Sequence, residues 1–275
     1  MGTAGMTRKI NRYSASNATQ KLAMGAGNTK SIEVTYAPFE YKILMAQNRF
    51  EYYDEQEMTD PMLVPVGVRH MGTDMFNTVN TDIFAEFNKA TQVIVVSALN
   101  FDAFADAQAM YNLENIEGVN FFAFVSPADV AALRKALGLS LQYVESFVRS
   151  GYVGTVAGVN IYTKKDAVSG TICTATKQAV TLFNKKGVEV ETPPRDSSDA
   201  NTRKNTIFSR KYYLPALTDE RYAVKIVKGT AVVSTDTTVT AGKTYYTKSG
   251  LGYVAVVPAE GDNPTTKGWY EITAT

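Results

Sequence analysis

Few residues in this chain have the types and spacing that catalysis requires, and His70 is the most prominent of them. It is the only histidine, and Asp74 lies one helical turn further on, so the two side chains could share a helix face. A Ser-His-acid triad would have to use His70, but no GxSxG sequence supplies its nucleophile. A metal site usually needs three or four ligands, and no HxxxH or CxxC spacing is present. We therefore predict no catalytic residue and no metal site, and we assign His70 to the surface or to an interface.

The segment GAGNTKS at residues 25–31 is similar to a phosphate-binding loop but lacks one defining glycine. Thr29 stands where the second glycine must precede the lysine. The segment also lies between two expected strands, whereas a phosphate-binding loop joins a strand to a helix. We predict a hairpin tip here and no bound cofactor.

The acidic run and the single cysteine have simpler structural explanations than chemistry. The run Asp54, Glu55, Glu57 and Asp60 precedes an expected helix, where acidic residues stabilise the N-terminal dipole. Cys173, in TICTAT, lies in a strand pattern and is predicted to be a small buried residue. One cysteine also excludes an internal disulfide framework.

Positive charge is concentrated near the N-terminus, although the formal net charge of the chain is only +1. Within residues 1–50, seven basic residues meet only two acidic ones. Such a segment suits docking onto an acidic neighbour or contact with DNA, and a solvated strand face is the alternative. The basic residues are Arg8, Lys9, Arg12, Lys21, Lys30, Lys42 and Arg49.

The element that would carry this charge is a long hairpin over residues 8–53. Ile32, Val34 and Tyr36 alternate with polar residues, and residues 39–45 alternate in the opposite phase. The phase changes at Ala37-Pro38, so we predict a bulge there that returns the apolar side chains to one face. Residues 14–31 are small, polar and glycine-rich, and would form an exposed or partner-bound tip.

A long helix and then alternating strands and helices are expected beyond the hairpin. Apolar residues recur at helical spacing through residues 65–90, and Pro65 suits the first turn. The segments QVIVVSAL and FFAFVS read as strands. Asn100 would cap one helix, and Ser126-Pro127-Ala128-Asp129 would start another that ends at Gly138. The helical stripe consists of Val68, Met71, Met75, Val79, Ile83 and Phe87.

The composition changes after Lys228. Residues 229–275 are rich in Thr, Gly, Val and Tyr, with turn signals at Ala241-Gly242 and Ser249-Gly250. We predict a small, separate all-β module at this end of the chain.

Within residues 149–226, turns at Gly151, Gly154 and Gly158 lead into VEVETPPRD and then SRKYYLPALTDERYAVKI. This segment resembles the closing half of a tailed-bacteriophage major capsid protein. The resemblance extends over residues 2–228 through the order of the elements. This family has the Hong Kong 97-type capsid fold, which is shared with encapsulins and with the capsid floor domain of herpesviruses.

The resemblance implies an α+β chain of the Hong Kong 97 type. Its parts would be an extended-loop hairpin at 1–56, a peripheral domain with the spine helix at 57–96, an axial domain at 97–170, peripheral-domain strands at 171–228 and the C-terminal all-β appendage at 229–275.

The resemblance also implies a non-enzymatic subunit that self-assembles into the icosahedral shell around the double-stranded DNA of a tailed bacteriophage. Its implied partners are copies of itself in pentamers and hexamers, portal, scaffolding and decoration proteins, and packaged DNA held non-specifically. No apolar run long enough for a membrane span and no signal peptide is evident, so assembly in the host cytoplasm and residence in the virion are expected. An encapsulin-type compartment and a phage tail or adhesin subunit are the alternatives.

Within such a shell, charged loops would form contacts between subunits. A mixed-sign group follows Pro193-Pro194, and each exposed ion pair would contribute about 0–1 kcal/mol. The predicted contact residues are Arg8, Arg12, Lys21, Lys30, Lys42, Arg49, Arg195, Asp196, Asp199 and Arg203.

Overall fold

The computed structural model describes residues 7–16, 18–113, 119–138 and 154–275. The chain divides into two compact units. The first unit comprises Met1–Asn80 and Leu182–Ala216, and the second comprises Thr81–Thr181 and Leu217–Thr275. The start of the glycine-turn series, including Gly151, lies outside the described residues.

A two-stranded hairpin opens the first unit. Strand β1 (Thr7–Ala15) pairs antiparallel with β2 (Val34–Lys42), and the register runs unbroken through Pro38, opposite Asn11. The predicted bulge at Ala37-Pro38 is therefore wrong. In a two-stranded ribbon each strand has one free edge, so a proline can be accommodated without shifting the register. Because the phase is not reset, apolar side chains lie on both faces of the hairpin.

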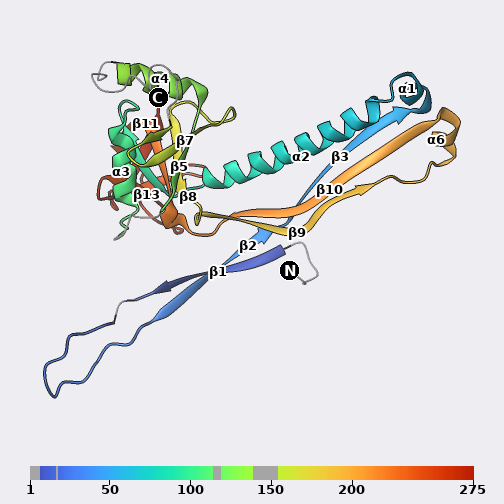
Figure 1. Cartoon of the computed structure of the whole chain (residues 1–275). Coiled ribbons are helices and arrows are strands. Elements are labelled where there is room, and N and C mark those ends of the chain that lie inside the picture. Colours follow the sequence, from blue (N-terminus) through green and yellow to red (C-terminus); the bar gives the residue numbers. More distant parts are fainter. Residues whose placement is uncertain (1–6, 17, 114–118, 139–153) are drawn as a thin grey trace. The chain divides into compact units, whose positions relative to one another are not determined.

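A three-stranded sheet and a long helix complete the first unit. The strand order is β3 (Leu44–Tyr53), β10 (Lys204–Leu217) and β9 (Val180–Glu191). Since β3 pairs with β10, the hairpin predicted over residues 8–53 is limited to β1 and β2. Helix α2 (Leu63–Phe87) lies alongside β3 (Figure 1) and confirms the helix predicted over 65–90, with ends shifted by two or three residues. Members of the predicted stripe that are buried in this unit are Met71, Met75 and Val79.

Gly67 allows α2 to approach β3 closely. A Cβ atom at this position would lie 2.5 Å from Cζ of Phe50. We predict that Gly67→Ala lowers the free energy of unfolding by about 1–3 kcal/mol, because the ring or the helix must move. Gly72 of the same helix has no atom within 4 Å of an added Cβ, so Gly72→Ala is the matched control. It should be neutral or stabilise the protein by up to about 1 kcal/mol. Urea denaturation of the two variants tests this, and equal stabilities would contradict it.

The second unit is built on a nine-stranded mixed sheet. Among the described residues, the sheet is accompanied by α3 (Asp102–Met110) and α4 (Pro127–Gly138). The strand order is β14 (Tyr270–Ala274), β12 (Tyr245–Ser249), β13 (Gly252–Val256), β4 (Gln92–Val96), β11 (Ala223–Val233), β8 (Thr171–Thr176), β5 (Phe121–Val125), β7 (Val159–Thr163) and β6 (Thr155–Val156).

The helix-start signals in this unit are confirmed. The amide of Ala103 donates to Oδ1 of Asn100 at 3.1 Å, and the amide of Asp129 donates to Oγ of Ser126 at 3.1 Å. Helix α4 ends at Gly138 as predicted. The predicted strands around residues 92–99 and 121–126 are β4 and β5. The core between helices and sheet contains the fully buried Phe104 and Leu133.

The C-terminal strands belong to this sheet and do not form a separate module. Strand β11 runs through residue 228 and pairs in parallel with β4 and antiparallel with β14. Strand β12 pairs with β13 and β14, and β13 pairs with β4, so these five strands close into a ring. Closure leaves few free strand edges, and it buries Tyr245 and Trp269. The predicted separate module is wrong because turn signals locate hairpins without specifying the strand that each one joins.

Two short helices, α1 (Asp54–Thr59) and α6 (Ser197–Thr202), belong to the first unit.

Within the described part of the chain, no helix has both the length and the apolar character that a membrane span requires.

Candidate functional site

His70 lies on the exposed side of α2. It lines a groove of about 410 Å³ together with Phe50 of β3 and Asp74. Oδ2 of Asp74 accepts a hydrogen bond from Nδ2 of Asn48 at 3.3 Å. No group of three or more potential ligands able to hold a metal ion occurs in the described ranges. The surface position predicted for His70 is confirmed.

Cys173 is buried in β8, as predicted. Its Sγ lies 3.2 Å from the carbonyl oxygen of Phe87 and can donate a hydrogen bond to it. Burial raises the pKa of the thiol to about 12, so it remains protonated at neutral pH. A buried protonated thiol is a poor nucleophile, and Cys173 is therefore a packing residue.

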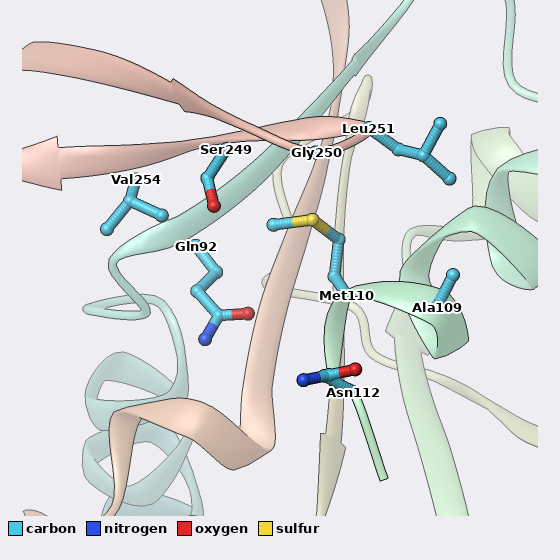
Figure 2. Close-up of a pocket in the computed structure, with 8 residues that line it drawn as sticks. All are labelled: Gln92, Ala109, Met110, Asn112, Ser249, Gly250, Leu251 and Val254. Atoms are coloured by element: carbon cyan, nitrogen blue, oxygen red, sulfur yellow. The ribbon is translucent and has the colours of Figure 1, made fainter. Parts of the chain in front are cut away.

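The second unit contains a hollow of about 340 Å³ (Figure 2). Figure 2 shows Gln92, the end of α3 and the β12–β13 turn around it, and Oε1 of Gln92 is buried without a hydrogen-bond partner. Among the described residues, no charged side chain lines the hollow, and none of them offers Ser249 a base there. The sequence did not indicate this hollow because its walls come from three distant segments. The lining residues are Gln92, Ala109, Met110, Asn112, Ser249, Gly250, Leu251 and Val254.

The mixed-sign residues after Pro194 meet the acidic run within the same chain. Arg195 forms an ion pair with Asp54, and its Nε donates to Oδ1 of Asn205 at 3.0 Å. Nδ2 of Asn205 in turn donates to Oδ1 of Asp54 at 2.8 Å. Oδ1 of Asp196 accepts from the amide of Asp199 at 2.7 Å and so caps α6.

The remaining charges of this region are also largely paired. Arg203 forms an ion pair with Glu55, and Nζ of Lys204 lies 2.9 Å from Oε1 of Glu51. The acidic run is predicted to lie just before the helix over 65–90, but it forms a short helix of its own. Asp54, Glu55 and Glu57 occupy the first turn of α1, and Asp60 lies at its C-cap. These residues therefore stabilise their own subunit, and their contacts with other subunits stay a prediction.

Arg195 should affect subunit stability in a pH-dependent way. Its hydrogen bond, with that of Asn205, holds the pKa of Asp54 below its usual range, so the ionised carboxylate stabilises the folded state. This contribution is present above the unfolded-state pKa of about 4 and is lost as the pH falls through the lower folded-state pKa.

We predict that Arg195→Met lowers the Tm of the isolated subunit at pH 7. The difference in Tm between this variant and the unmodified chain should shrink towards pH 3. Thermal unfolding at both pH values measures this. Arg69→Met, on exposed α2, is the control and should change neither Tm. If Arg195→Met leaves the Tm unchanged but impairs association of subunits, the result would instead support the predicted role of Arg195 in a contact between subunits.

The basic residues of the hairpin strands have several local partners. The guanidinium of Arg8 lies 4.5 Å from the ring centroid of Phe183. Nζ of Lys9 lies 2.8 Å from Oε1 of Glu40. Arg49, on β3, lies 3.4 Å from Glu51. Arg12 and Lys42 are paired in register with Ala37 and Thr7, whereas Lys21 and Lys30 lie exposed in the loop between the strands.

The hairpin also leaves apolar side chains uncovered. Tyr13 is 70% exposed, Tyr36 is 66% exposed and Val34 is 61% exposed. The rings of Tyr13 and Tyr36 face each other with centroids 6.3 Å apart. GAGNTKS lies in the loop of this hairpin, which confirms the predicted tip. An exposed apolar surface of this kind indicates a partner.

Comparison with known proteins finds phage capsid proteins among the chains that are similar to this one. No protein-family model matches the chain. The chain is 26% identical over 166 residues to the major capsid protein of Staphylococcus phage phiMR11, and the match covers 59% of this chain and 58% of that protein. The chain thus spans less than two thirds of that relative's length.

Solved structures decide the fold. The capsid structure of Cyanophage P-SCSP1u matches with a TM-score of 0.62 and 13% identity, over 82% of this chain and 84% of that chain. The mature capsid of bacteriophage PhiM1 matches with a TM-score of 0.59 and 12% identity, over 81% and 82%. The chain has the Hong Kong 97-type capsid fold. The holo-SrpI encapsulin complex from Synechococcus elongatus matches with a TM-score of 0.55 and 12% identity, over 71% and 78%.

The capsid fold confirms the predicted α+β class, but sequence reasoning missed several residues that hold this version of it together. Asn205 and Gly67 carry no local signal because their partners, Asp54 and Phe50, are distant in sequence. The alternation of apolar and polar residues along β10 could have indicated that Asn205 lies in a strand. It could not have indicated that the side chain of Asn205 binds Asp54.

Proposed function

We propose that this chain is a major capsid protein that assembles with copies of itself into the closed icosahedral shell of a tailed bacteriophage. The observation that carries the proposal is the sequence similarity to the major capsid protein of Staphylococcus phage phiMR11. The fold alone would not distinguish phage capsids from encapsulins, since both are among the similar structures.

The hairpin and the paired charges suit a subunit that functions through its surfaces. The β1–β2 hairpin would serve as the extended loop and α2 as the spine helix, while the assignment of 97–170 to the axial domain and of 57–96 and 171–228 to the peripheral domain rests on the family resemblance. Weak contacts repeated over many copies in closed symmetry would give the shell its strength. The subunit would be structural and not an enzyme.

Further partners follow from this role. Portal and scaffolding proteins would take part in assembly, and decoration proteins could bind the finished shell. Packaged double-stranded DNA would be held by non-specific contacts to basic residues, with Lys21 and Lys30 as exposed candidates. The chain would be assembled in the bacterial cytoplasm and reside in the virion.

An encapsulin-type compartment is the second candidate, favoured by the similarity to the holo-SrpI complex. The content of particles from cells that naturally produce the chain separates the two functions. Nuclease-protected double-stranded DNA of genome length supports the capsid. An enclosed enzyme without such DNA would support the encapsulin and contradict the proposal.

A further inference from the structure

The hollow between the end of α3 and the β12–β13 turn (Figure 2) has no part in the assembly of a shell. Its volume of about 340 Å³ lies within the range of pockets that hold small molecules. All of its described lining residues belong to the second unit, so the hollow forms within one compact body. It is therefore a candidate binding site in its own right.

Close contacts hold the walls of the hollow in place. A Cβ atom added at Gly252 would lie 2.7 Å from the carbonyl oxygen of Val93 and 2.9 Å from Cε of Met110. The β12–β13 hairpin therefore rests directly on β4 and on the end of α3. The helix end is anchored in turn by the buried Tyr111, whose hydroxyl donates to Oγ1 of Thr174 at 3.0 Å. The hollow is thus preformed in the single chain.

The polar groups of the hollow have no partners of their own. Oε1 of Gln92 is buried and accepts no hydrogen bond from any described residue. The side chains of Asn112 and Ser249 also form no hydrogen bond within the described part of the chain. In Figure 2 the side chain of Gln92 lies between these two residues. A buried acceptor without a donor is unfavourable, so a bound molecule that donates to Gln92 would be favoured.

The other described side chains of the hollow restrict the chemistry of such a molecule. Met110, Leu251 and Val254 add apolar surface, and no described lining residue is charged. A charged ligand would lose hydration there without gaining an opposite charge. Side-chain amides and the serine hydroxyl both donate and accept, and so does the hydroxyl group of a ligand. The best match is an uncharged molecule with several hydroxyl groups and some C–H surface.

We propose that this hollow binds a neutral sugar residue of hexose size, with one sugar hydroxyl donating to Oε1 of Gln92. The C–H surface of the sugar would pack on Met110 and Leu251. A free sugar and the terminal residue of a glycan offer this same chemistry. The site goes beyond the proposed function, because a shell can assemble without it.

Saturation-transfer difference NMR of the full, folded chain tests the site. The probes are glucose, galactose and N-acetylglucosamine, each at about 10 mM, because a ligand of this size is expected to bind with a Kd of about 1 mM. We expect saturation transfer to at least one of them. Glucuronate, which carries a negative charge, should receive at least about tenfold less.

Two variants locate the binding. Gln92→Met keeps the approximate shape of the side chain but removes the acceptor, and should weaken binding at least about tenfold. Ala109→Trp should fill the hollow and abolish binding. Ala105→Trp is the matched control and should bind as the unmodified chain does. Both alanines are exposed on α3, but only Ala109 lines the hollow.

Thermal unfolding separates a binding role of Gln92 from a structural one. Gln92→Met should leave the Tm unchanged or raise it, because the variant removes a buried acceptor that has no donor. A clear fall in Tm would show that the amide stabilises the fold, and would overturn the proposal.

The binding experiment has its own contrary results. No saturation transfer to any of the three sugars overturns the site, and so does transfer that persists in both Gln92→Met and Ala109→Trp. Equal transfer to glucuronate overturns the neutral specificity. None of these results affects the proposed function, which depends on whether shells form.

Methyl glycosides of the sugar that binds distinguish its two sources. Equal binding of the methyl glycoside supports the terminal residue of a glycan, because the linkage then points away from the hollow. Loss of binding supports a free sugar that is held through its anomeric hydroxyl.

Discussion

Deleting residues 14–30 is expected to yield a folded subunit that forms no closed shells. The deletion removes most of the loop between β1 and β2, together with the last two residues of β1, Ser14 and Ala15, so that Val34 loses its register partner Ala15. Among the described residues of this segment, only Ala18 is buried, so the cores of both units should remain intact. If shells are held together by weak, repeated contacts, loss of one contact in every subunit prevents closure.

Sedimentation velocity and thermal unfolding measure the two sides of this prediction. The deleted chain should sediment as monomers or small oligomers, with a Tm close to that of the unmodified chain. Normal shells from the deleted chain would contradict the role of the hairpin. A large fall in Tm would show instead that the hairpin belongs to the subunit core.

Removing residues 234–275 is expected to unfold the second unit. The truncation deletes three of the five strands in the closed ring and leaves β4 and β11 each without one neighbour. It also deletes the buried residues Tyr245 and Trp269, whose aromatic ring centroids lie 5.8 Å apart. Trp269→Ala alone should cost about 3–5 kcal/mol, as expected for a buried aromatic side chain.

Circular dichroism during urea denaturation measures these losses, and Val257→Ala at a 94% exposed position is the control. Because Trp269 is the only tryptophan, its fluorescence reports unfolding of this region in the control and the unmodified chain. A truncated chain that still unfolds cooperatively and forms shells would contradict this expectation and support the prediction that residues 229–275 form a separate module.

Local signals in the sequence predicted the helices well. The cap residues Asn100 and Ser126 and the apolar spacing from Met71 to Phe87 act within a few residues along the chain. A helix satisfies its backbone hydrogen bonds internally, so such signals locate it without knowledge of the rest of the fold.

Strand partners and charged contacts could not be predicted in this way. The acidic Asp54 and its partner Arg195 are 141 residues apart, and no spacing rule connects them. The parallel pairing of β11 with β4 likewise joins segments separated by most of the second unit. The change of phase at Pro38 predicts a bulge only if one face of the hairpin is buried, and in a single subunit β2 is exposed along almost its whole length.

Cryo-electron microscopy of particles formed by the full chain tests the central claim most directly. The account predicts isometric closed shells built of pentamers and hexamers, in which the β1–β2 hairpin of each subunit contacts a neighbouring copy. Tubes, trimers or monomers under conditions where the chain is folded would contradict it.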